Sequence, residues 1–138
     1  MIIDASVAFK WIVLETDSDV ARPLLTRTDL MAPAIINVEI GYVLTKRVRQ
    51  RSLSQELART AWRDLAAYPV ALVDDAPLLN AAFELSLALG AAFYDCIYLA
   101  QAIRDDDVVI TADERFIQAV RSAPGAGRRV QSLTENLI

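Results

Sequence analysis

The chain has 138 residues, a length that suits one hydrophobic core, and we expect a single domain over residues 1–138. Its formal charge is −4, and it contains no histidine and one cysteine. This composition excludes histidine-dependent triads, Cys–His pairs and zinc sites built from several nitrogen or sulfur ligands. No apolar run approaches the roughly 20 residues that span a bilayer, and residues 1–6 lack signal-peptide features, so we expect a cytoplasmic protein without a membrane partner.

Short strands and helices are predicted in alternation along the chain. In chain order we expect a strand at 2–3, a helix over 7–13 capped by Ser6, a helix over 16–29, a strand at 30–32, and a helix that starts at Pro33 and carries Glu39. There follow a helix over 55–67, a strand at 70–73, helices over 74–89 and 94–104, a strand at 108–111, a helix opening at 112–116 and a strand at 129–131.

Apart from the strand at 129–131, the predicted strands are short and largely apolar, without the alternation of polar and apolar residues found in a sheet with one face in water. Strands of this kind are buried on both faces, and helices between them favour parallel pairing. The sequence therefore predicts an α/β sandwich with a mainly parallel central sheet and helices on both faces.

Two acids follow predicted strands: Asp4 after the first, and Asp113 after the strand at 108–111. In open parallel sheets, functional sites form outside the carboxyl ends of the strands, so both side chains are expected in one crevice. The hydroxyls of Ser6 and Thr111 lie two residues from these acids and are expected to orient the carboxylates or waters around them. Simple roles as a cap and a strand-end hydroxyl are open alternatives.

Two further acids lie on apolar helix faces. The neighbours of Glu39 three and four positions away are Ile35, Ile36, Tyr42 and Val43, and Asp95 also has apolar neighbours at these spacings. Each of the four acids alone has a structural explanation, as a helix cap, an ion-pair partner or a complement to a helix dipole. Together in one crevice, they would repel one another, and hard divalent cations relieve such repulsion.

A carboxylate and metal site suits phosphodiester hydrolysis, because a divalent cation activates water and stabilises charge on the phosphoryl group. Aspartyl-phosphate enzymes also place an acid after the first strand. The haloacid-dehalogenase-like type, however, requires a second aspartate two residues after the first, and this chain has Ser6 at that position. A receiver-like domain requires a lysine late in the chain, and the last lysine of this sequence is Lys46. Both aspartyl-phosphate interpretations are therefore disfavoured.

At these same positions the sequence resembles the PIN-domain family, specifically the VapC toxins of bacterial and archaeal toxin–antitoxin pairs. The matching motifs are Ile3-Asp4-Ala5-Ser6, the helical Glu39 in the segment 33–39, Tyr94-Asp95-Cys96-Ile97-Tyr98-Leu99-Ala100, and Thr111-Ala112-Asp113-Glu114-Arg115-Phe116. The resemblance covers essentially the whole chain. It implies a three-layer α/β/α PIN-like sandwich with four to five short strands.

The resemblance further implies an endoribonuclease that uses Mg²⁺ or Mn²⁺, with Asp4 and Asp95 as the principal metal ligands. Glu39 and Asp113 would complete the acidic pocket through waters or a second ion. It also implies a toxin that cleaves structured RNA such as tRNA or rRNA, forms a homodimer and is blocked by a VapB-like antitoxin. A housekeeping PIN nuclease without an antitoxin, and a catalytically silent RNA- or protein-binding PIN module, are the alternatives.

The basic residues Lys46, Arg47, Arg49 and Arg51, at the end of the Glu39 helix, are candidates for RNA phosphate contacts. A solvated helix end is the alternative explanation for them. The acidic net charge does not oppose RNA binding, because two bound divalent ions would balance it.

Overall fold

A computed structural model describes residues 1–135 and shows a five-stranded sheet in which every pairing is parallel. The strands are β1 (Ile2–Ile3), β2 (Leu30–Pro33), β3 (Val70–Val73), β4 (Val109–Thr111) and β5 (Val130–Ser132). Their order across the sheet is β3-β2-β1-β4-β5. Ile2 pairs with Met31 on one side and Val109 on the other, so β1 lies at the centre.

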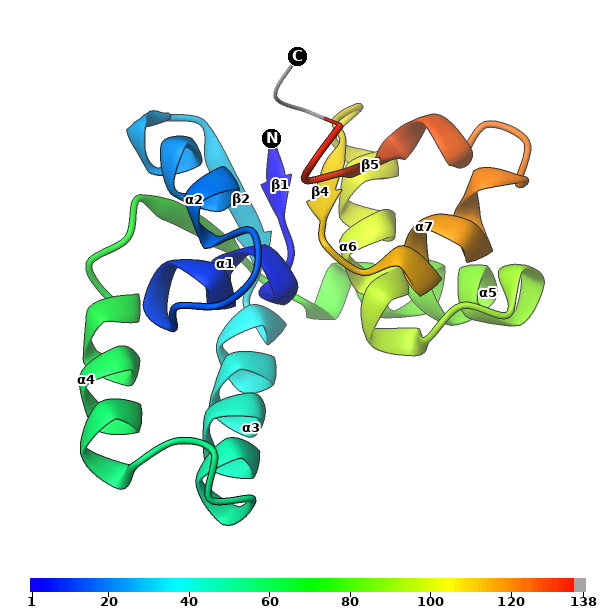
Figure 1. The fold of residues 1–138 in the computed structure, drawn as a ribbon. Coiled ribbons are helices and arrows are strands. Elements are labelled where there is room, and N and C mark those ends of the chain that lie inside the picture. Colours follow the sequence, from blue (N-terminus) through cyan, green and yellow to red (C-terminus); the bar gives the residue numbers. More distant parts are fainter. Residues whose placement is uncertain (136–138) are drawn as a thin grey trace.

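The helices are α1 (Ala5–Ile12), α2 (Ser18–Ala21), α3 (Ile35–Arg49), α4 (Gln55–Leu65), α5 (Leu79–Leu89), α6 (Phe93–Arg104) and α7 (Glu114–Arg121). Figure 1 shows α1 to α4 on one side of the sheet and α5 to α7 on the other. The reversal of strand order at β1 accounts for this division, because right-handed crossovers in opposite directions put their helices on opposite faces. The expected three-layer α/β/α sandwich is confirmed.

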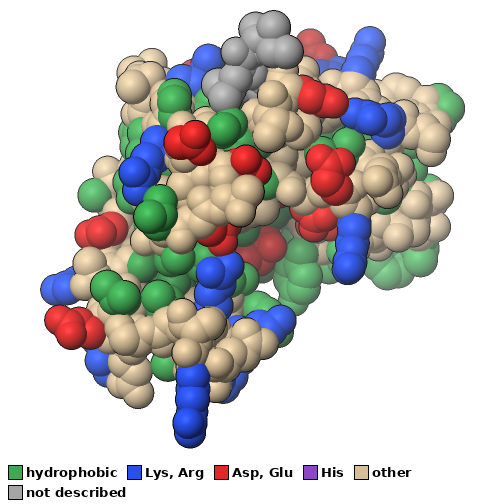
Figure 2. All heavy atoms as spheres, in the orientation of Figure 1, with side chains coloured by type: hydrophobic (Ala, Val, Ile, Leu, Met, Phe, Trp, Pro, Cys, Tyr) green, Lys and Arg blue, Asp and Glu red, His purple; other side chains and the backbone are tan. Residues whose placement is uncertain are grey.

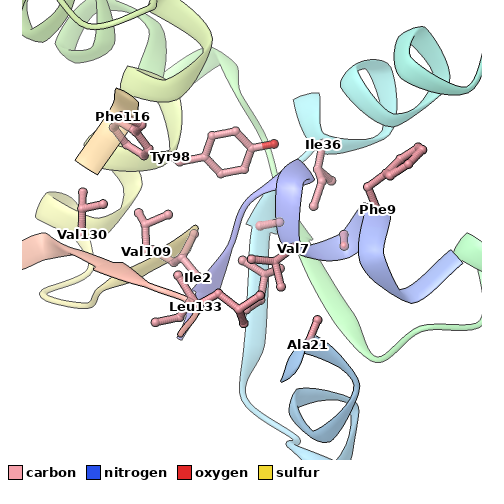
Figure 3. Packing of buried hydrophobic residues seen from close by; sticks show 14 of the residues in the cluster. Ile2, Val7, Phe9, Ala21, Ile36, Tyr98, Val109, Phe116, Val130 and Leu133 are labelled. Carbon is pink, nitrogen blue, oxygen red and sulfur yellow. The ribbon is translucent and has the colours of Figure 1, made fainter. Parts of the chain in front are cut away.

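The core lies around the central strands. Ile2, Ile3, Val109 and Ile110 are fully buried between the helical layers, which explains their continuous apolar pattern. Figure 3 shows Ile2 and Val109 beside Val130, with Phe116 nearby. A smaller cluster contains Ala82 from α5 and the fully buried Cys96 from α6, and burial raises the pKa of the Cys96 thiol to about 11. Cys96 is therefore a core residue.

Four predicted elements differ from the structure. The helix expected over 74–89 begins with a 3₁₀ helix at Ala76–Leu78, and α5 starts only at Leu79. The helix expected over 16–29 is divided into α2 and a 3₁₀ helix at Arg22–Thr26, because Pro23 has no N–H for the α-helical pattern. Pro33 ends β2 and does not start a helix; α3 begins at Ile35. Ser6 lies inside α1, and the residue that caps this helix is Asp4.

Within residues 1–135 no single helix is long and apolar enough to cross a membrane. The segments Ala76–Leu89 and Phe93–Arg104 meet that requirement together, by length and composition only, and are bent by 115° at the break between them.

Candidate active site

Asp4 lies at the carboxyl end of β1 and is 5% exposed. Its Oδ1 accepts hydrogen bonds from the Ser6 hydroxyl at 2.6 Å and from the backbone N–H of Val7 at 3.1 Å. The hydroxyl of Thr111 donates to Oδ2. Both carboxylate oxygens are therefore held in place, and the bond from Val7 also caps α1.

Ser6 and Thr111 also join β1 to β4. The backbone N–H of Ala112 donates to the Ser6 hydroxyl, and that of Asp113 donates to the Thr111 hydroxyl, each at 2.9 Å. Each hydroxyl donates to Asp4 and accepts a hydrogen bond from the loop after β4, so the single proton of each is committed to Asp4. The two hydroxyls therefore contact Asp4 as expected from the sequence, although Ser6 does not cap the helix.

Asp113 follows β4 and caps α7. Its Oδ1 accepts hydrogen bonds from the backbone N–H groups of Arg115 at 2.8 Å and Phe116 at 3.3 Å. Because β4 and β1 are neighbours, this carboxylate lies at the same sheet edge as Asp4. This is also the point where the strand order reverses, the usual place for a site in an open parallel sheet.

Glu39 reaches the site from α3, one turn beyond Ile35, and is half-buried. The hydroxyl of Tyr98 donates to its Oε1 at 2.8 Å. Burial raises the pKa of Glu39 to about 7; the Tyr98 hydrogen bond opposes this rise, and the negative charges of Asp4 and Asp75 add to it.

Asp95 lies in the first turn of α6, the helix that packs against β1, β2 and β4. Burial, together with the smaller effect of the charges of Asp113, Asp4 and Glu39, raises its pKa to about 7. Burial also raises the pKa of Asp4, with a smaller contribution from Asp113. These mutual effects place the four predicted acids in one shared electrostatic field, and Figure 2 shows acidic side chains around the hollow near the middle of this face.

The donor set fits a hard divalent cation. Among the described residues, none of the four acids forms an ion pair with a lysine or arginine, so their combined charge has no protein counterion. Carboxylate oxygens are the ligands that Mg²⁺ and Mn²⁺ prefer. No group of three acids within residues 1–135 is close enough to enclose one ion as the side chains stand. Mg²⁺ does not require such a cluster, because it usually keeps several waters and binds one or two carboxylates.

The four basic candidates lie at the end of α3 and differ in their surroundings. Arg47 donates to Glu15 at 2.7 Å, and its guanidinium lies 4.7 Å from the centre of the Phe9 ring. The ammonium of Lys46 lies 5.9 Å from the ring centre of Tyr42, and Arg49 and Arg51 are exposed. The guanidinium of Arg47 is therefore already engaged within the fold, whereas the other three face solvent.

Two residues beside the acids were not predicted from the sequence to act there. Tyr98 lies three positions after Asp95, and this helical spacing on one face was the signal that could have identified it. Asp75, which lies at the start of the helix expected over 74–89, accepts a hydrogen bond from the Ile35 backbone N–H at 3.0 Å. It thereby caps α3, the helix that carries Glu39.

Two apolar surfaces lie away from the acids. A groove between α3 and α4 has a volume of 850 Å³, and Leu44 and Trp62 line it together with Arg59 and Arg63. On α5 the side chains of Leu79, Phe83 and Leu87 are exposed at a spacing of four residues, which puts them on one helix face. Apolar surfaces of this kind mark sites of contact with partners.

Comparison with known proteins agrees with this geometry. The family model of the PIN domain matches residues 1–121. Ribonuclease VapC1 of Mycobacterium tuberculosis is 32% identical over 102 residues, which cover 72% of this chain and 74% of that protein.

Two solved structures share the fold. PAE2754 of Pyrobaculum aerophilum superposes with a TM-score of 0.73 at 18% identity, covering 97% of this chain and 83% of that one. VapBC2 of Rickettsia felis, solved with a DNA fragment from its promoter, gives a TM-score of 0.65 at 15% identity, covering 95% and 96%. The family model and the fold cover most of the sequence, and the chain belongs to the PIN domain family.

Proposed function

We propose that this protein is a Mg²⁺- or Mn²⁺-dependent endoribonuclease that hydrolyses RNA phosphodiester bonds, and that residues 1–138 form one nuclease domain. Asp4, Glu39, Asp95 and Asp113 are its catalytic residues. The observation that carries the proposal is the buried carboxylate of Asp4, which is held at both oxygens and lies in the field of three other acids without a protein counterion. The 32% identity to Ribonuclease VapC1 supports the choice of reaction.

In this proposal Asp4 and Asp95 hold the ion directly, and Glu39 and Asp113 hold waters around it. Ser6 and Thr111 keep the two oxygens of Asp4 in a fixed direction. When bound, Mg²⁺ or Mn²⁺ would neutralise the acids, polarise the phosphodiester and make water a better nucleophile at neutral pH. Because the chain contains no histidine, the acids are the available proton acceptors for the attacking water.

The substrate is structured RNA, such as tRNA or rRNA, cut in an accessible loop. Lys46, Arg49 and Arg51 face solvent at the end of α3 and are suited to contact phosphates. Their contribution is local, which reconciles RNA binding with the formal charge of −4 on the whole chain.

The protein acts in the cytoplasm as the toxin of a type II toxin–antitoxin pair, and its inhibitor is a VapB-like antitoxin. The similarity to VapC1 and to the VapBC2 structure supports this role. The groove between α3 and α4 suits a peptide segment with an apolar face and acidic flanks, because the two arginines Arg59 and Arg63 outnumber the one acid, Glu56, beside its apolar lining. Co-expression with the product of the neighbouring gene should give a stable complex in which RNA cleavage is blocked. Cleavage that persists in the complex would favour a housekeeping PIN nuclease.

The protein also forms a homodimer through the exposed face of α5. Leu79, Phe83 and Leu87 form an exposed apolar strip on one helix face, and two copies of such a strip can pack symmetrically. Light scattering should report a dimer for the unaltered protein and a monomer for Phe83→Glu, which buries a charge in the contact. A dimer that survives Phe83→Glu would contradict this assignment.

The nuclease is tested by cleavage of a total RNA preparation with purified protein. Cleavage should stop in EDTA and return when Mg²⁺ or Mn²⁺ is added in excess. Without a bound cation, the four acids cannot stabilise negative charge on the phosphoryl group or activate water. Sequencing the new 5′ ends would identify the target RNA. Full cleavage in EDTA would refute metal dependence, and no cleavage under any condition would favour a catalytically silent PIN module.

A further inference from the structure

Tyr98 is a buried polar residue at the centre of the candidate site. It lies on α6, three residues after Asp95, and is 1% exposed. Figure 3 shows its ring beside Phe116 and its hydroxyl directed across the core toward α1 and α3. The phenol therefore extends from the helix of Asp95 toward the helix of Glu39 and passes near the start of α1, which Asp4 caps.

A buried phenol needs a hydrogen-bond partner, and here the partner is Oε1 of Glu39 at 2.8 Å. The two residues are 59 positions apart in the chain, so this bond connects α6 to α3. The hydroxyl uses one acceptor position of the carboxylate and leaves the remaining lone pairs for other donors or a cation.

Without this bond, nothing in the described contacts would hold the Glu39 carboxylate in one position at the site. Its long side chain has several rotamers, and the charges of Asp4 and Asp75 repel it. A donor at a fixed position in a packed core holds one carboxylate oxygen against that repulsion. The cost of ordering the side chain is then met during folding, before any ion or RNA binds.

We propose that Tyr98 is a positioning residue for the nuclease: its hydroxyl holds the Glu39 carboxylate at a fixed distance from Asp4 and Asp95. The predicted change in kcat rests on the proposed function, because it can be measured only if the protein is a nuclease. It also predicts a change in divalent-ion binding, which can be measured without RNA.

Tyr98→Phe removes only the hydroxyl. We expect kcat for RNA cleavage to fall by roughly 10- to 100-fold with KM for RNA nearly unchanged, the usual size of effect for an outer-shell partner. Calorimetric titration of the metal-free protein with Mn²⁺ alone should show a loss of affinity in the same range, of about 10- to 100-fold. Tyr68→Phe is the matched control, because the Tyr68 hydroxyl donates to the Trp11 carbonyl at 3.1 Å and contacts none of the four acids.

Glu39→Gln identifies the route of the effect. If Tyr98 acts through Glu39, adding Tyr98→Phe to Glu39→Gln should change Mn²⁺ affinity by less than about twofold, because the carboxylate to be positioned is already absent. Additive losses in the double variant would overturn the proposal. An unchanged kcat and Mn²⁺ affinity in Tyr98→Phe would overturn it as well.

The two hypotheses fail in different ways. Wild-type protein that binds Mn²⁺ but cuts no RNA would refute the proposed function, while the Mn²⁺ titrations would still decide the role of Tyr98. Wild-type protein that binds no Mn²⁺ would refute both. If Tyr98→Phe loses its circular dichroism spectrum and Tyr68→Phe keeps it, the hydroxyl serves the fold rather than the site, and the positioning role is overturned.

Discussion

The hydroxyl of Thr111, at the end of β4, donates a hydrogen bond to Oδ2 of Asp4, at the end of β1. The two residues are 107 positions apart in the chain, and both are buried. The same hydroxyl accepts the backbone N–H of Asp113, so one side chain sets the position of two candidate catalytic acids. The sheet edge and the site are therefore held together by the same atoms.

Thr111→Val should lower RNA cleavage by roughly 10- to 100-fold, because valine has nearly the same shape but cannot donate to Asp4. Thr111→Ser keeps the hydroxyl and should retain most of the activity. Thr26→Val is a control, since the exposed Thr26 hydroxyl donates only to the Pro23 carbonyl. The measurement is kcat on a defined RNA, and equal rates for Thr111→Val and wild type would show that the bond does not serve catalysis.

The central strands could be predicted from the sequence, because β1 and β4 are buried on both faces and are apolar apart from Thr111. The edge strand β3 is apolar although it is partly exposed, and β5 contains Gln131 and Ser132. The start of α3 could not be predicted. The backbone N–H of Ile35 is capped by Asp75, which is 40 residues further along the chain, and Pro33 pairs with Val73 at the end of the sheet. Local capping rules favoured Pro33 as a first helical residue, and tertiary contacts moved the boundary.

The four acids could be proposed because an ionised side chain after a buried strand or on an apolar helix face is costly without a partner. Their partners within the protein could not be predicted in full. The Tyr98 to Glu39 bond joins two helices that local patterns do not orient relative to each other. The sequence likewise grouped Arg47 with three other basic residues, and only the fold shows its ion pair with Glu15.

The metal-free protein should become less stable as pH rises from 5 to 8. Glu39 and Asp95 have pKa values of about 7 in the fold and near 4 when unfolded, so the folded state keeps protons that the unfolded state has lost. Their stabilising effect is full below about pH 4 and disappears as pH passes 7. We expect the Tm to fall by about 5 °C across this interval, after allowance for solvent screening of these partly exposed groups.

Added Mg²⁺ should raise the Tm more at pH 8 than at pH 5, since the acids must be ionised to bind it. Asp95→Asn should make the Tm of the metal-free protein depend less on pH, because asparagine does not titrate. A Tm that rises steadily from pH 5 to 8 in EDTA would contradict the shared electrostatic field. Differential scanning calorimetry at matched ionic strength is the measurement.

The exposed basic residues should affect RNA affinity, while Arg47 should affect the fold. Lys46→Gln or Arg49→Gln should weaken RNA binding and flatten the plot of log K against log salt by about 0.7 for each phosphate that is no longer neutralised. Arg47→Gln should instead lower the Tm, because it removes an ion pair with Glu15 and the packing against the Phe9 ring. Fluorescence anisotropy over a range of salt and a thermal melt separate the two outcomes. An unchanged salt slope in both exposed variants would remove them from the RNA interface.

Gln101→Leu should stabilise the protein. Gln101 is fully buried on α6, and among the described residues neither atom of its side-chain amide has a partner at hydrogen-bond distance, although the amide is near enough to Asp105 to help lower the pKa of that carboxyl. Leucine has a similar volume and no polar group to desolvate, so the free energy of unfolding should increase by about 1–3 kcal/mol. Urea denaturation measures the change, and Ala102→Ser, which adds a hydroxyl at another fully buried α6 position, should destabilise. A less stable Gln101→Leu would indicate a polar partner for the amide.

The central claim is that the four acids form one metal-dependent nuclease site, and Asp95→Asn tests it most directly. Asparagine keeps the size of the side chain and removes the charge that Asp4, Glu39 and Asp113 oppose. RNA cleavage and Mn²⁺ binding should both be lost, while the protein stays folded and the metal-free form becomes at least as stable as wild type at pH 8. Unchanged RNA cleavage by folded Asp95→Asn protein would contradict the claim.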